Sequence, residues 1–337
     1  LHHESYIKIM NVPVLLILYK RPETTIHVIN SLKKVKAKLI YIAINKPPNN
    51  KNLQDYHNYK KILKLVAEID WKCKLVIKKR KKYLSSYESV KSSVEWFFKN
   101  EKEGIVLEDD TVPNKSFFIF CKELLKKYRN NKQISQICGT SFVNRKKIIN
   151  HSYIFSKYSP TWGYATWRRS INDYDEKMKD WPKLRKKRSL LKIINNKGFL
   201  FYWTRIFDSQ YKNKSKHWDE RWLYSNWKNS KLSIIPKKNL VKNIGFGATA
   251  THTKTEQWYS NLETQEIEYK NKHPKKIFAN FEYDNWLTVN VFGVNFIYNL
   301  SQKFKKNKII KNRLIFSMLK KVYKIIQPLF RLKGFSN

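Results

Sequence analysis

Glycine is scarce in this sequence, with eight residues in 337, and the phosphate-binding loops that depend on glycine are missing. No Gly-x-x-x-x-Gly-Lys-Ser/Thr loop occurs, and no Gly-x-Gly-x-x-Gly opens a helix after the first apolar run. These absences argue against a P-loop nucleotidase and against a Rossmann dehydrogenase. His-Glu-x-x-His and Gly-x-Ser-x-Gly are absent too, so neither the zinc-peptidase nor the hydrolase motif is present.

Cysteines and long apolar runs are also few. Cys73, Cys121 and Cys138 lie in apolar surroundings without metal-ligand spacing, which predicts reduced thiols in a cytosolic protein. No run reaches the roughly 18 apolar residues that cross a bilayer, so we expect a soluble or peripheral protein. A short apolar run follows Met10 in place of a signal peptide. We therefore expect Met10 to be the start and set residues 1–9 apart as an upstream segment.

Acidic residues are outnumbered by basic ones, 26 against 69, which gives a formal net charge of +43. A charge of this size favours phosphates, nucleic acid or an anionic membrane surface as partners. The alternative is a compositional bias, because Lys, Asn and Ile are abundant throughout the chain. On that interpretation much of the charge only solvates the surface.

Alternating apolar runs and helical patterns fill the first 140 residues. Strands are expected at 12–19, 39–44, 73–77, 105–107 and 134–138. After a break at 20–22, a helix is expected from the pattern of Ile26, Ile29 and Leu32, and further helices are expected over 56–69, 85–99 and 113–128. Crossovers of this length predict a parallel, right-handed α/β sheet. With 42% apolar residues the chain can bury one catalytic domain, and we expect appendages to it.

Three acids follow the strand at 105–107 directly: Glu108, Asp109 and Asp110. The carboxyl ends of strands in open α/β sheets border the ligand crevice. Adjacent carboxylates repel one another and supply hard oxygen ligands, so a divalent cation would relieve the repulsion. The alternative is an acidic loop that caps the next helix, whose first turn Pro113 would preset.

The second half of the chain is rich in tryptophan and tyrosine between residues 153 and 227. Such rings are most often core. Beside carboxylates they also suit sugar recognition, because flat apolar faces stack on sugar CH groups while polar neighbours bind hydroxyls.

At this point a family resemblance becomes visible. The chain resembles bacterial GT-A glycosyltransferases of the nucleotide-diphospho-sugar transferase superfamily, and it is more distantly similar to the N-acetylglucosaminyltransferase that begins N-glycan branching. The similar stretches run in order from about Met10 to His273. They are VPVLLILYKRPETT, IVLEDDTVPNKSFFIFCKELL, SPTWGYATWRRSINDYD, HWDERW and NLVKNIGFGATATHT. The resemblance implies a GT-A fold, that is, a Rossmann-like mixed, mainly parallel sheet flanked by helices. It places the nucleotide-sugar-binding half at 10–150 and the acceptor-binding half at 151–300.

Site residues are implied motif by motif. Asp110 would bind Mn²⁺ or Mg²⁺, which neutralises the departing diphosphate. Asp219 matches the catalytic base of the distant relative, which implies inversion; Glu220 is the fallback base, and the alternative for Asp219 is an N-cap of a helix over 220–227. His252 is either a metal or diphosphate contact or a structural hydrogen-bonder. The expected donor-binding residues are Tyr19, Lys20, Arg21, Asn45, Glu108, Asp109 and Trp162.

Two stretches depart from the family pattern. Where relatives have an Asp-Gly pair for the nucleotide base, this chain has Ile44-Asn45. Where they have Asn-Leu-Gly and then basic residues, it has 83–89, which contains Glu88. The first change removes a base-binding carboxylate and the second a phosphate-binding charge. Lys20, Arg21 and the basic run 78–82 are the expected replacements.

The C-terminal segment 301–337 is expected to be a basic amphipathic tail. Apolar residues recur there at helical spacing, among them Ile310, Leu314, Met318 and Val322, and Lys311 and Lys320 are available to the other faces. The tail would either lie on an anionic membrane or pack on the catalytic domain. Three function classes remain: a glycosyltransferase acting in the cytoplasm, either free or peripheral on the inner face of the plasma membrane; a catalytically impaired scaffold; and a basic nucleic-acid-binding protein.

Overall fold

The computed structural model describes residues 11–48, 52–142, 151–186, 190, 197–246, 258–267 and 271–294. The chain divides into two compact units, one of residues 1–182 with 207–284, and one of residues 183–206 with 285–337. The domain boundaries at 150 and 300 stay predictions.

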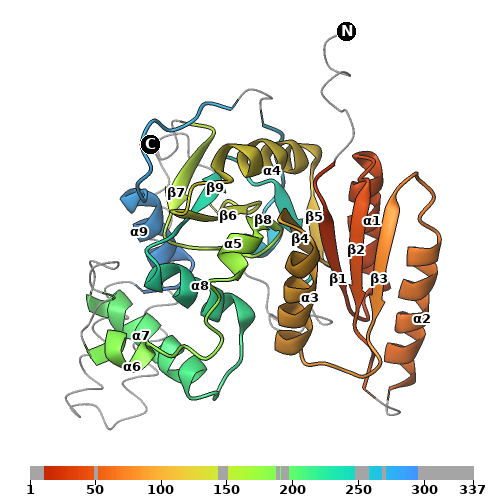
Figure 1. The fold of residues 1–337 in the computed structure, drawn as a ribbon, viewed down its shortest axis with the longest axis horizontal. Coiled ribbons are helices and arrows are strands. Elements are labelled where there is room, and N and C mark those ends of the chain that lie inside the picture. The colour runs from red at the N-terminus through yellow and green to blue at the C-terminus, as the bar shows by residue number, and fades with distance from the viewer. Residues whose placement is uncertain are drawn as a thin grey trace. The chain divides into compact units, whose positions relative to one another are not determined.

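The larger unit contains the strands and most of the helices (Figure 1). Along the described chain the strands are β1 (Val14–Leu18), β2 (Leu39–Ile44), β3 (Lys74–Lys79), β4 (Glu103–Glu108), β5 (Thr111–Pro113), β6 (Ile134–Cys138), β7 (Tyr153–Ser156), β8 (Tyr164–Trp167), β9 (Leu232–Pro236) and β10 (Val241–Asn243). The helices are α1 (Pro22–Lys34), α2 (Leu53–Ala67), α3 (Ser86–Asn100), α4 (Lys115–Tyr128), α5 (Arg168–Ile171), α6 (Trp181–Lys186), α7 (Lys197–Tyr211), α8 (Trp218–Lys228), the 3₁₀ turn η3 (Trp258–Asn261) and α9 (Phe281–Asn290).

Eight strands form one mixed sheet in the order β3-β2-β1-β4-β8-β6-β9-β7. β1 pairs in parallel with β2 and β4, β2 with β3, and β6 with β9. β8 runs antiparallel between β4 and β6, and β7 is antiparallel to β9. The expected mixed, mainly parallel α/β sheet is confirmed. A separate ribbon joins β10 to β5.

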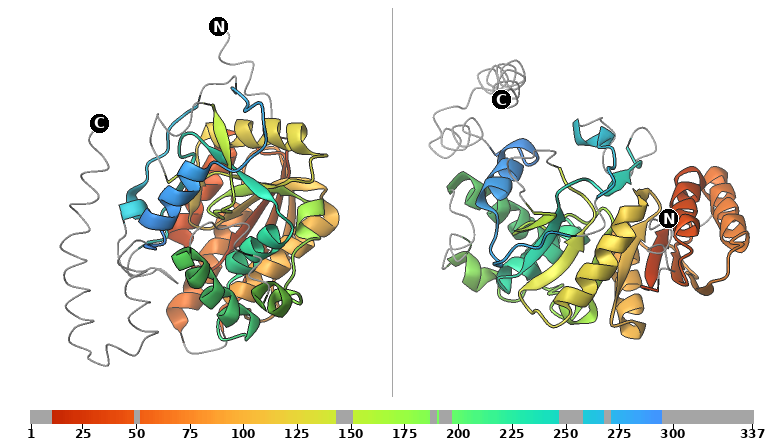
Figure 2. Two further views of the ribbon diagram at one scale, coloured as in Figure 1. Left: turned by 90° about the vertical axis from the view of Figure 1, so that its left-hand side faces the viewer. Right: turned by 90° about the horizontal axis from the view of Figure 1, so that it is seen from above.

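Helices cover both faces of the sheet, as Figure 2 shows from two further directions. Because side chains alternate along a strand, Val14 and Leu16 of β1 join the core with α1, α2 and α4. Leu15 and Ile17 join the opposite core with α3 and α8. A strand buried on both faces needs the continuous apolar run found in β1.

The segment after the acids differs from the expectation. Pro113 is the last residue of β5 and pairs with Val241, so it does not open the helix. α4 begins at Lys115, and its N-cap Asn114 accepts a hydrogen bond from the Phe117 amide. β5 separates the acids from this helix, and the alternative of a helix-capping acidic loop is therefore wrong.

The smaller unit is held by aromatic contacts in its described part. Trp203 packs against Phe199 and Phe292 with ring centroids 6.1 and 5.3 Å away. The predicted basic tail 301–337 lies outside the described residues. In the described ranges, no helix combines the length and the apolar character needed to span a bilayer.

Candidate active site

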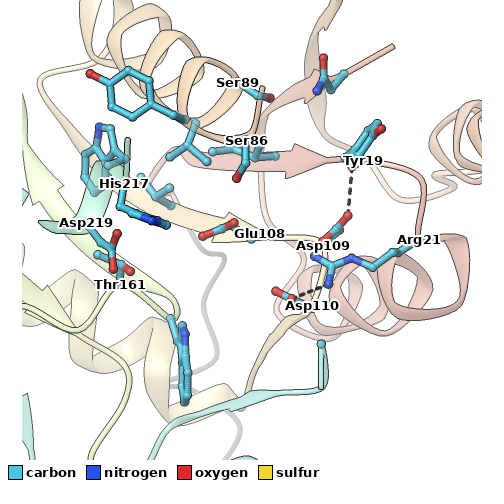
Figure 3. A pocket seen from close by; sticks show the side chains of 18 of the residues that line it. Tyr19, Arg21, Ser86, Ser89, Glu108, Asp109, Asp110, Thr161, His217 and Asp219 are labelled. Atoms are coloured by element: carbon cyan, nitrogen blue, oxygen red, sulfur yellow. Dashed lines mark hydrogen bonds and ion pairs between the residues drawn. The ribbon is translucent and has the colours of Figure 1, made fainter. Parts of the chain in front are cut away.

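A cavity of about 540 Å³ opens where β1, β2 and β4 reach their carboxyl ends (Figure 3). Parallel strands bring these ends to one edge, so residues far apart in sequence meet there. Its lining comes from the larger unit: Ile17, Tyr19, Arg21, Asn45, Tyr83, Leu84, Ser86, Tyr87, Ser89, Val90, Val106, Glu108, Asp109, Asp110, Thr161, Trp162, Tyr164, Lys216, His217, Trp218, Asp219, Asn243, Gly245 and Phe246.

The three acids Glu108, Asp109 and Asp110 form an acidic turn at the end of β4, and hydrogen bonds connect this turn to the end of β1. The Tyr19 amide donates to Asp109 Oδ2 over 3.0 Å, and Arg21 Nη2 donates to Asp109 Oδ1. Arg21 Nη1 pairs with Asp110 Oδ2 at 2.8 Å. One guanidinium thus bridges two adjacent carboxylates, and its fork geometry fixes how they point.

The single positive charge of Arg21 does not balance the carboxylates of the acidic turn. Burial raises the pKa of Glu108, and the charges of Asp110 and Asp109 raise it further. Burial also raises the pKa of Asp109, although Arg21 acts in the opposite direction. Glu108 and Asp109 therefore resist ionisation, and a further cation nearby would favour their charged forms.

A close backbone approach completes the acidic turn. The Ile244 amide donates to the Asp110 carbonyl over 2.9 Å, and the Gly245 amide donates to Asn243 Oδ1 over 2.8 Å. A Cβ atom at position 245 would lie 1.9 Å from Asp110 Oδ2. Only glycine lets the chain after β10 pass this carboxylate, which the bare Gly-Phe-Gly sequence did not reveal.

Asp219 faces the acidic turn from the opposite wall. Figure 3 shows Glu108 between the Asp109–Asp110–Arg21 cluster on one side and Asp219 with His217 on the other. The N-cap of α8 is His217, so Asp219 stands in the first helical turn, and the alternative that it caps this helix is wrong. The negative charge of Asp219 also contributes to the raised pKa of Glu108, after burial and the nearer acids.

Glu220, the fallback base, is directed away from this wall. Its carboxylate accepts a hydrogen bond from Gln210 Nε2, and it is not among the residues that line the cavity. Burial, followed by the neighbouring charge of Asp219, raises the pKa of Glu220. Asp219 is therefore the better placed of the two acids.

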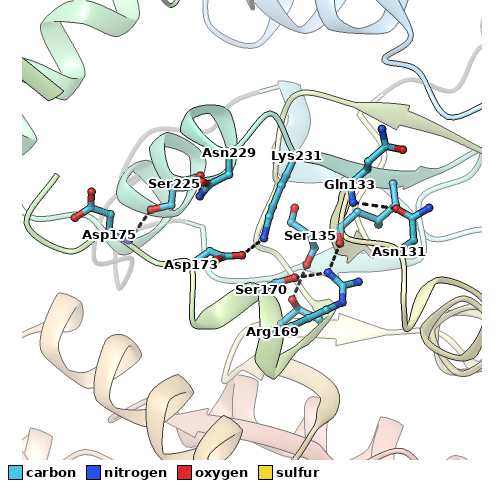
Figure 4. A network of polar contacts seen from close by, with 12 residues as sticks. Asn131, Gln133, Ser135, Arg169, Ser170, Asp173, Asp175, Ser225, Asn229 and Lys231 are labelled. Carbon is cyan, nitrogen blue, oxygen red and sulfur yellow. Dashed lines mark hydrogen bonds and ion pairs between the residues drawn. The ribbon is translucent and has the colours of Figure 1, made fainter. Parts of the chain in front are cut away.

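Buried polar contacts hold α8, and with it Asp219. The amide of His217 donates to Gln210 Oε1 over 3.1 Å at the start of the helix. Further along, Ser225 Oγ accepts from the Asp175 amide over 2.9 Å, a contact that Figure 4 shows within its polar network. Trp222 Nε1 donates to Gln136 Oε1 of β6 over 2.6 Å. These bonds tie the helix to the sheet and to the loop before α6.

The two departures from the family pattern meet in space. Asn45 Nδ2 donates to the Leu84 carbonyl over 2.8 Å, and the Leu84 amide donates to Asn45 Oδ1 over 3.1 Å. Glu88 forms a capping box with Ser85 at the start of α3. Asn45 thus joins the loop to the end of β2, while the Glu88 carboxylate accepts from the amide and the hydroxyl of the N-cap Ser85.

The expected positive charges are only partly at the cavity. Arg21 lines it, but Lys20 pairs with Asp55 at 3.1 Å and, like residues 78–82, is not among the lining residues. Lys216, which sequence reasoning missed, does line the cavity. Its only sequence signal is its place just before His-Trp-Asp.

Most of the predicted site residues come together. The cavity gathers eight of them: Tyr19, Arg21, Asn45, Glu108, Asp109, Asp110, Trp162 and Asp219. Lys20 and Glu220 do not line it, and His252 lies outside the described residues. Thr161, Tyr164, His217 and Gly245 were missed. All four lie within the quoted motif stretches, so their place in these stretches was the available signal.

The chemistry of the acidic turn fits a divalent cation shared with a ligand. No set of three or more His, Cys, Asp or Glu side chains within the described ranges could hold a metal by itself. Mg²⁺-type sites on phosphate substrates commonly use one or two carboxylates plus the substrate's own oxygens. Asp109 is engaged by Tyr19 and Arg21, whereas Asp110 meets Arg21 through one oxygen. Asp110 is therefore the carboxylate best suited to a metal.

Comparison with known proteins gives partial structural similarities. No protein-family model and no curated protein matches the chain. A Pyrobaculum calidifontis mannosyltransferase, solved with GDP-Man and Mn²⁺, is similar with a TM-score of 0.33 and 8% identity over 47% of this chain and 45% of its own length. The galactosyltransferase LgtC, solved with donor and acceptor sugar analogues, is similar with a TM-score of 0.32 and 10% identity over 63% of this chain and 69% of its own length. The glycosyltransferase GlyE of Streptococcus pneumoniae is similar with a TM-score of 0.30 and 10% identity over 66% of this chain and 45% of its own length. At these scores the similarities carry no functional argument, which must come from the cavity itself.

Proposed function

We propose that this chain is a metal-dependent GT-A glycosyltransferase. It would move a hexosyl or N-acetylhexosaminyl group from a nucleotide diphosphate to a hydroxyl of a glycan or glycolipid, with inversion. The proposal rests on one observation: two aspartates with different surroundings stand on opposite walls of one cavity. Asp110 with Arg21 stands on one wall, and Asp219 stands on the other.

On the donor wall, Arg21 and Asp110 serve the diphosphate. A divalent cation at Asp110 would act as a Lewis acid that stabilises the charge of the leaving diphosphate. Arg21 keeps Asp109 and Asp110 oriented and adds a fixed positive charge. Lys216, from the chain just before α8, is a second cation of the cavity lining. Tyr19 and Tyr83, whose ring centroids are 6.1 Å apart, give the nucleoside an aromatic wall.

On the acceptor wall, Asp219 would serve as the general base. Its carboxylate takes the proton of the acceptor hydroxyl while that oxygen attacks the anomeric carbon. The bond from the anomeric carbon to the diphosphate oxygen breaks at the same time, on the opposite face of the sugar ring. A single displacement of this kind inverts the anomeric configuration.

An aromatic cluster gives the acceptor an apolar surface. Trp162 packs with Phe142, Phe246 and Tyr259 at centroid distances of 5.5, 5.5 and 5.9 Å. All four rings keep part of their surface exposed, and Trp162 and Phe246 line the cavity. Such rings suit the CH face of a sugar. We assign Trp162, which the family resemblance gave to the donor, to the acceptor. From the family resemblance we further propose a role in surface polysaccharide synthesis at the cytoplasmic face of the membrane, with the tail 301–337 as a peripheral contact.

The test is turnover of nucleotide sugars by the full chain. We expect at least one member of a panel of UDP- and GDP-sugars to release its nucleoside diphosphate in the presence of Mn²⁺, and much less with a chelator. An impaired scaffold would bind a donor without turnover. A nucleic-acid-binding protein would neither bind nor hydrolyse any donor, and either result would reject the proposed reaction.

A further inference from the structure

Tyr164 has a buried hydroxyl that forms no hydrogen bond within the described parts of the chain. The residue is 3% exposed and lines the cavity. Burying a polar group without a partner costs folding free energy, so such groups are rare and require an explanation. A ligand that supplies the missing partner is one explanation, and the position of Tyr164 in the cavity lining favours it.

The ring of Tyr164 is fixed by its neighbours. It stacks on Trp218 with centroids 6.0 Å apart and an interplanar angle of 23°. Trp218 in turn stacks on Trp222 at 5.4 Å and on Tyr174 at 5.7 Å. A ring held in this aromatic stack cannot turn its hydroxyl toward solvent without disturbing α8. The hydroxyl is therefore held in place before any ligand arrives.

The charge of Glu108 acts on this hydroxyl. Tyr164 is paired with Val106 across β8 and β4, and Glu108 follows two residues later on the same face of β4. Burial, and next the negative charge of Glu108, raise the pKa of Tyr164. No hydrogen bond joins the two side chains, since the Tyr164 hydroxyl has no described partner. Both residues line the cavity, as do their strand neighbours Ile17 and Val106.

Glu108 and Tyr164 differ in the hydrogen bonds that each can form with a ligand. The carboxyl group of Glu108 can accept a hydrogen bond, whereas a phenol with no partner can donate one. A single alcohol group answers both, because its O–H donates to Glu108 while its oxygen accepts from Tyr164. A methyl group would leave both groups without a hydrogen-bond partner.

We propose that Tyr164 and Glu108 form a sugar-hydroxyl subsite in the cavity floor and that Tyr164 sets which donor sugar is accepted. The inference rests on the proposed function, because the hydroxyl is assigned to the sugar of the nucleotide donor. Tyr164 acts here as a specificity-determining residue that binds substrate.

The test compares Tyr164→Phe with the parent protein by calorimetric titration in Mn²⁺. The probes are UDP-glucose, UDP-galactose, UDP-N-acetylglucosamine and GDP-mannose, each beside UDP or GDP alone. For the sugar nucleotide that the parent binds best, Tyr164→Phe should raise Kd about 10-fold, as for a lost hydrogen bond. The Kd of the matching nucleoside diphosphate should change less than about 2-fold, because the diphosphate lies outside the subsite.

Tyr224→Phe is the matched control. The Tyr224 hydroxyl is also buried with no described partner, but its ring packs on Trp181 and Phe207 and does not line the cavity. Both variants remove an unsatisfied group, so both should melt at or above the parent's Tm without ligand. Only Tyr164→Phe should lose affinity for the sugar nucleotide.

The outcomes separate the subsite from the enzyme. Equal sugar-nucleotide affinity in Tyr164→Phe and parent overturns the subsite while the proposed function stands. An equal loss of affinity for the nucleoside diphosphate in Tyr164→Phe also overturns the subsite. A Tm of Tyr164→Phe well below that of Tyr224→Phe overturns it too, because it would mean that the Tyr164 hydroxyl has a structural partner. If the parent binds neither nucleotide sugars nor diphosphates, the proposed function fails and the subsite fails with it. Where the parent binds a sugar nucleotide, deoxy-sugar analogues of that donor identify which sugar hydroxyl occupies the subsite. The analogue that lacks this hydroxyl should bind the parent and Tyr164→Phe with equal affinity.

Discussion

Replacing Gly245 with alanine perturbs the acidic turn by one methyl group. The added Cβ would lie 1.9 Å from Asp110 Oδ2, 2.7 Å from its Cγ and 2.9 Å from Arg21 Nη1. To reach ordinary contact distance, the carboxylate must move by about 1.5 Å. Asp110 cannot make that shift and keep its 2.8 Å ion pair with Arg21.

The expected magnitudes follow from that displacement. Loss of the Arg21–Asp110 pair, whose side chains are 18% and 13% exposed, should lower the free energy of unfolding by about 1–3 kcal/mol. A catalytic group displaced by more than 1 Å typically costs about 10²-fold in rate, and a disturbed metal ligand about 10- to 100-fold in metal affinity. We therefore expect Gly245→Ala to fold and to lose nearly all Mn²⁺-dependent turnover.

The assay combines urea unfolding with Mn²⁺ titration of donor turnover. Gly293→Ala is the control, because its Cβ would meet nothing within 4 Å but its φ of +67° disfavours a side chain. The control should lose about 1 kcal/mol of stability and keep its activity. If Gly245→Ala retains the parent's Mn²⁺ dependence and turnover, Asp110 is not positioned as argued.

Three further changes test other parts of the account. Asp110→Asn keeps the shape but removes the charge, so metal-dependent donor binding should fall steeply in titrations while the fold survives; unchanged Mn²⁺ and donor affinity would rule Asp110 out as a ligand. Asp219→Asn should leave donor Kd nearly intact and lower kcat about 10²-fold or more, and an unaltered kcat would dismiss Asp219 as the base. Burial raises the pKa of Asp284 to about 6, above its ordinary value, so its contribution to stability is present below about pH 4 and lost as pH rises through 6. Each unit of pKa difference is worth about 1.4 kcal/mol, and urea unfolding of parent and Asp284→Asn should show a stability difference that shifts by about 3 kcal/mol between pH 4 and 7; a difference that stays constant with pH would contradict this assignment.

The sequence predicted the elements whose patterns are strong. The strands β2 (Leu39–Ile44) and β6 (Ile134–Cys138) appear with the expected bounds. In β2 the reason is a continuous apolar run, which a strand buried on both faces favours. The three-residue strands β5 and β10 were not predicted, since so short a segment carries no periodicity. The antiparallel entry of β8 between β4 and β6 likewise depends on long-range pairing that no local pattern encodes.

The candidate site was predicted where a motif names its residues and missed where backbone geometry decides. Asp110 and Asp219 were expected from their motifs, and both line the cavity. The bond between Asn45 and Leu84 joins residues 39 apart in sequence, so no local pattern reveals that the two departures support each other. Gly245 acts through its missing side chain, which only the distance to Asp110 makes visible.

The anomeric configuration of the product tests the central claim most directly. An α-linked nucleotide sugar that the parent accepts would be turned over with Mn²⁺ and a sugar acceptor, and the new linkage read by NMR from its anomeric coupling. The account predicts a β-linked product, formed at least about 10²-fold more slowly by Asp219→Asn. An α-linked product, or a β-linked product formed equally fast by Asp219→Asn, would contradict a single displacement driven by Asp219 across this cavity.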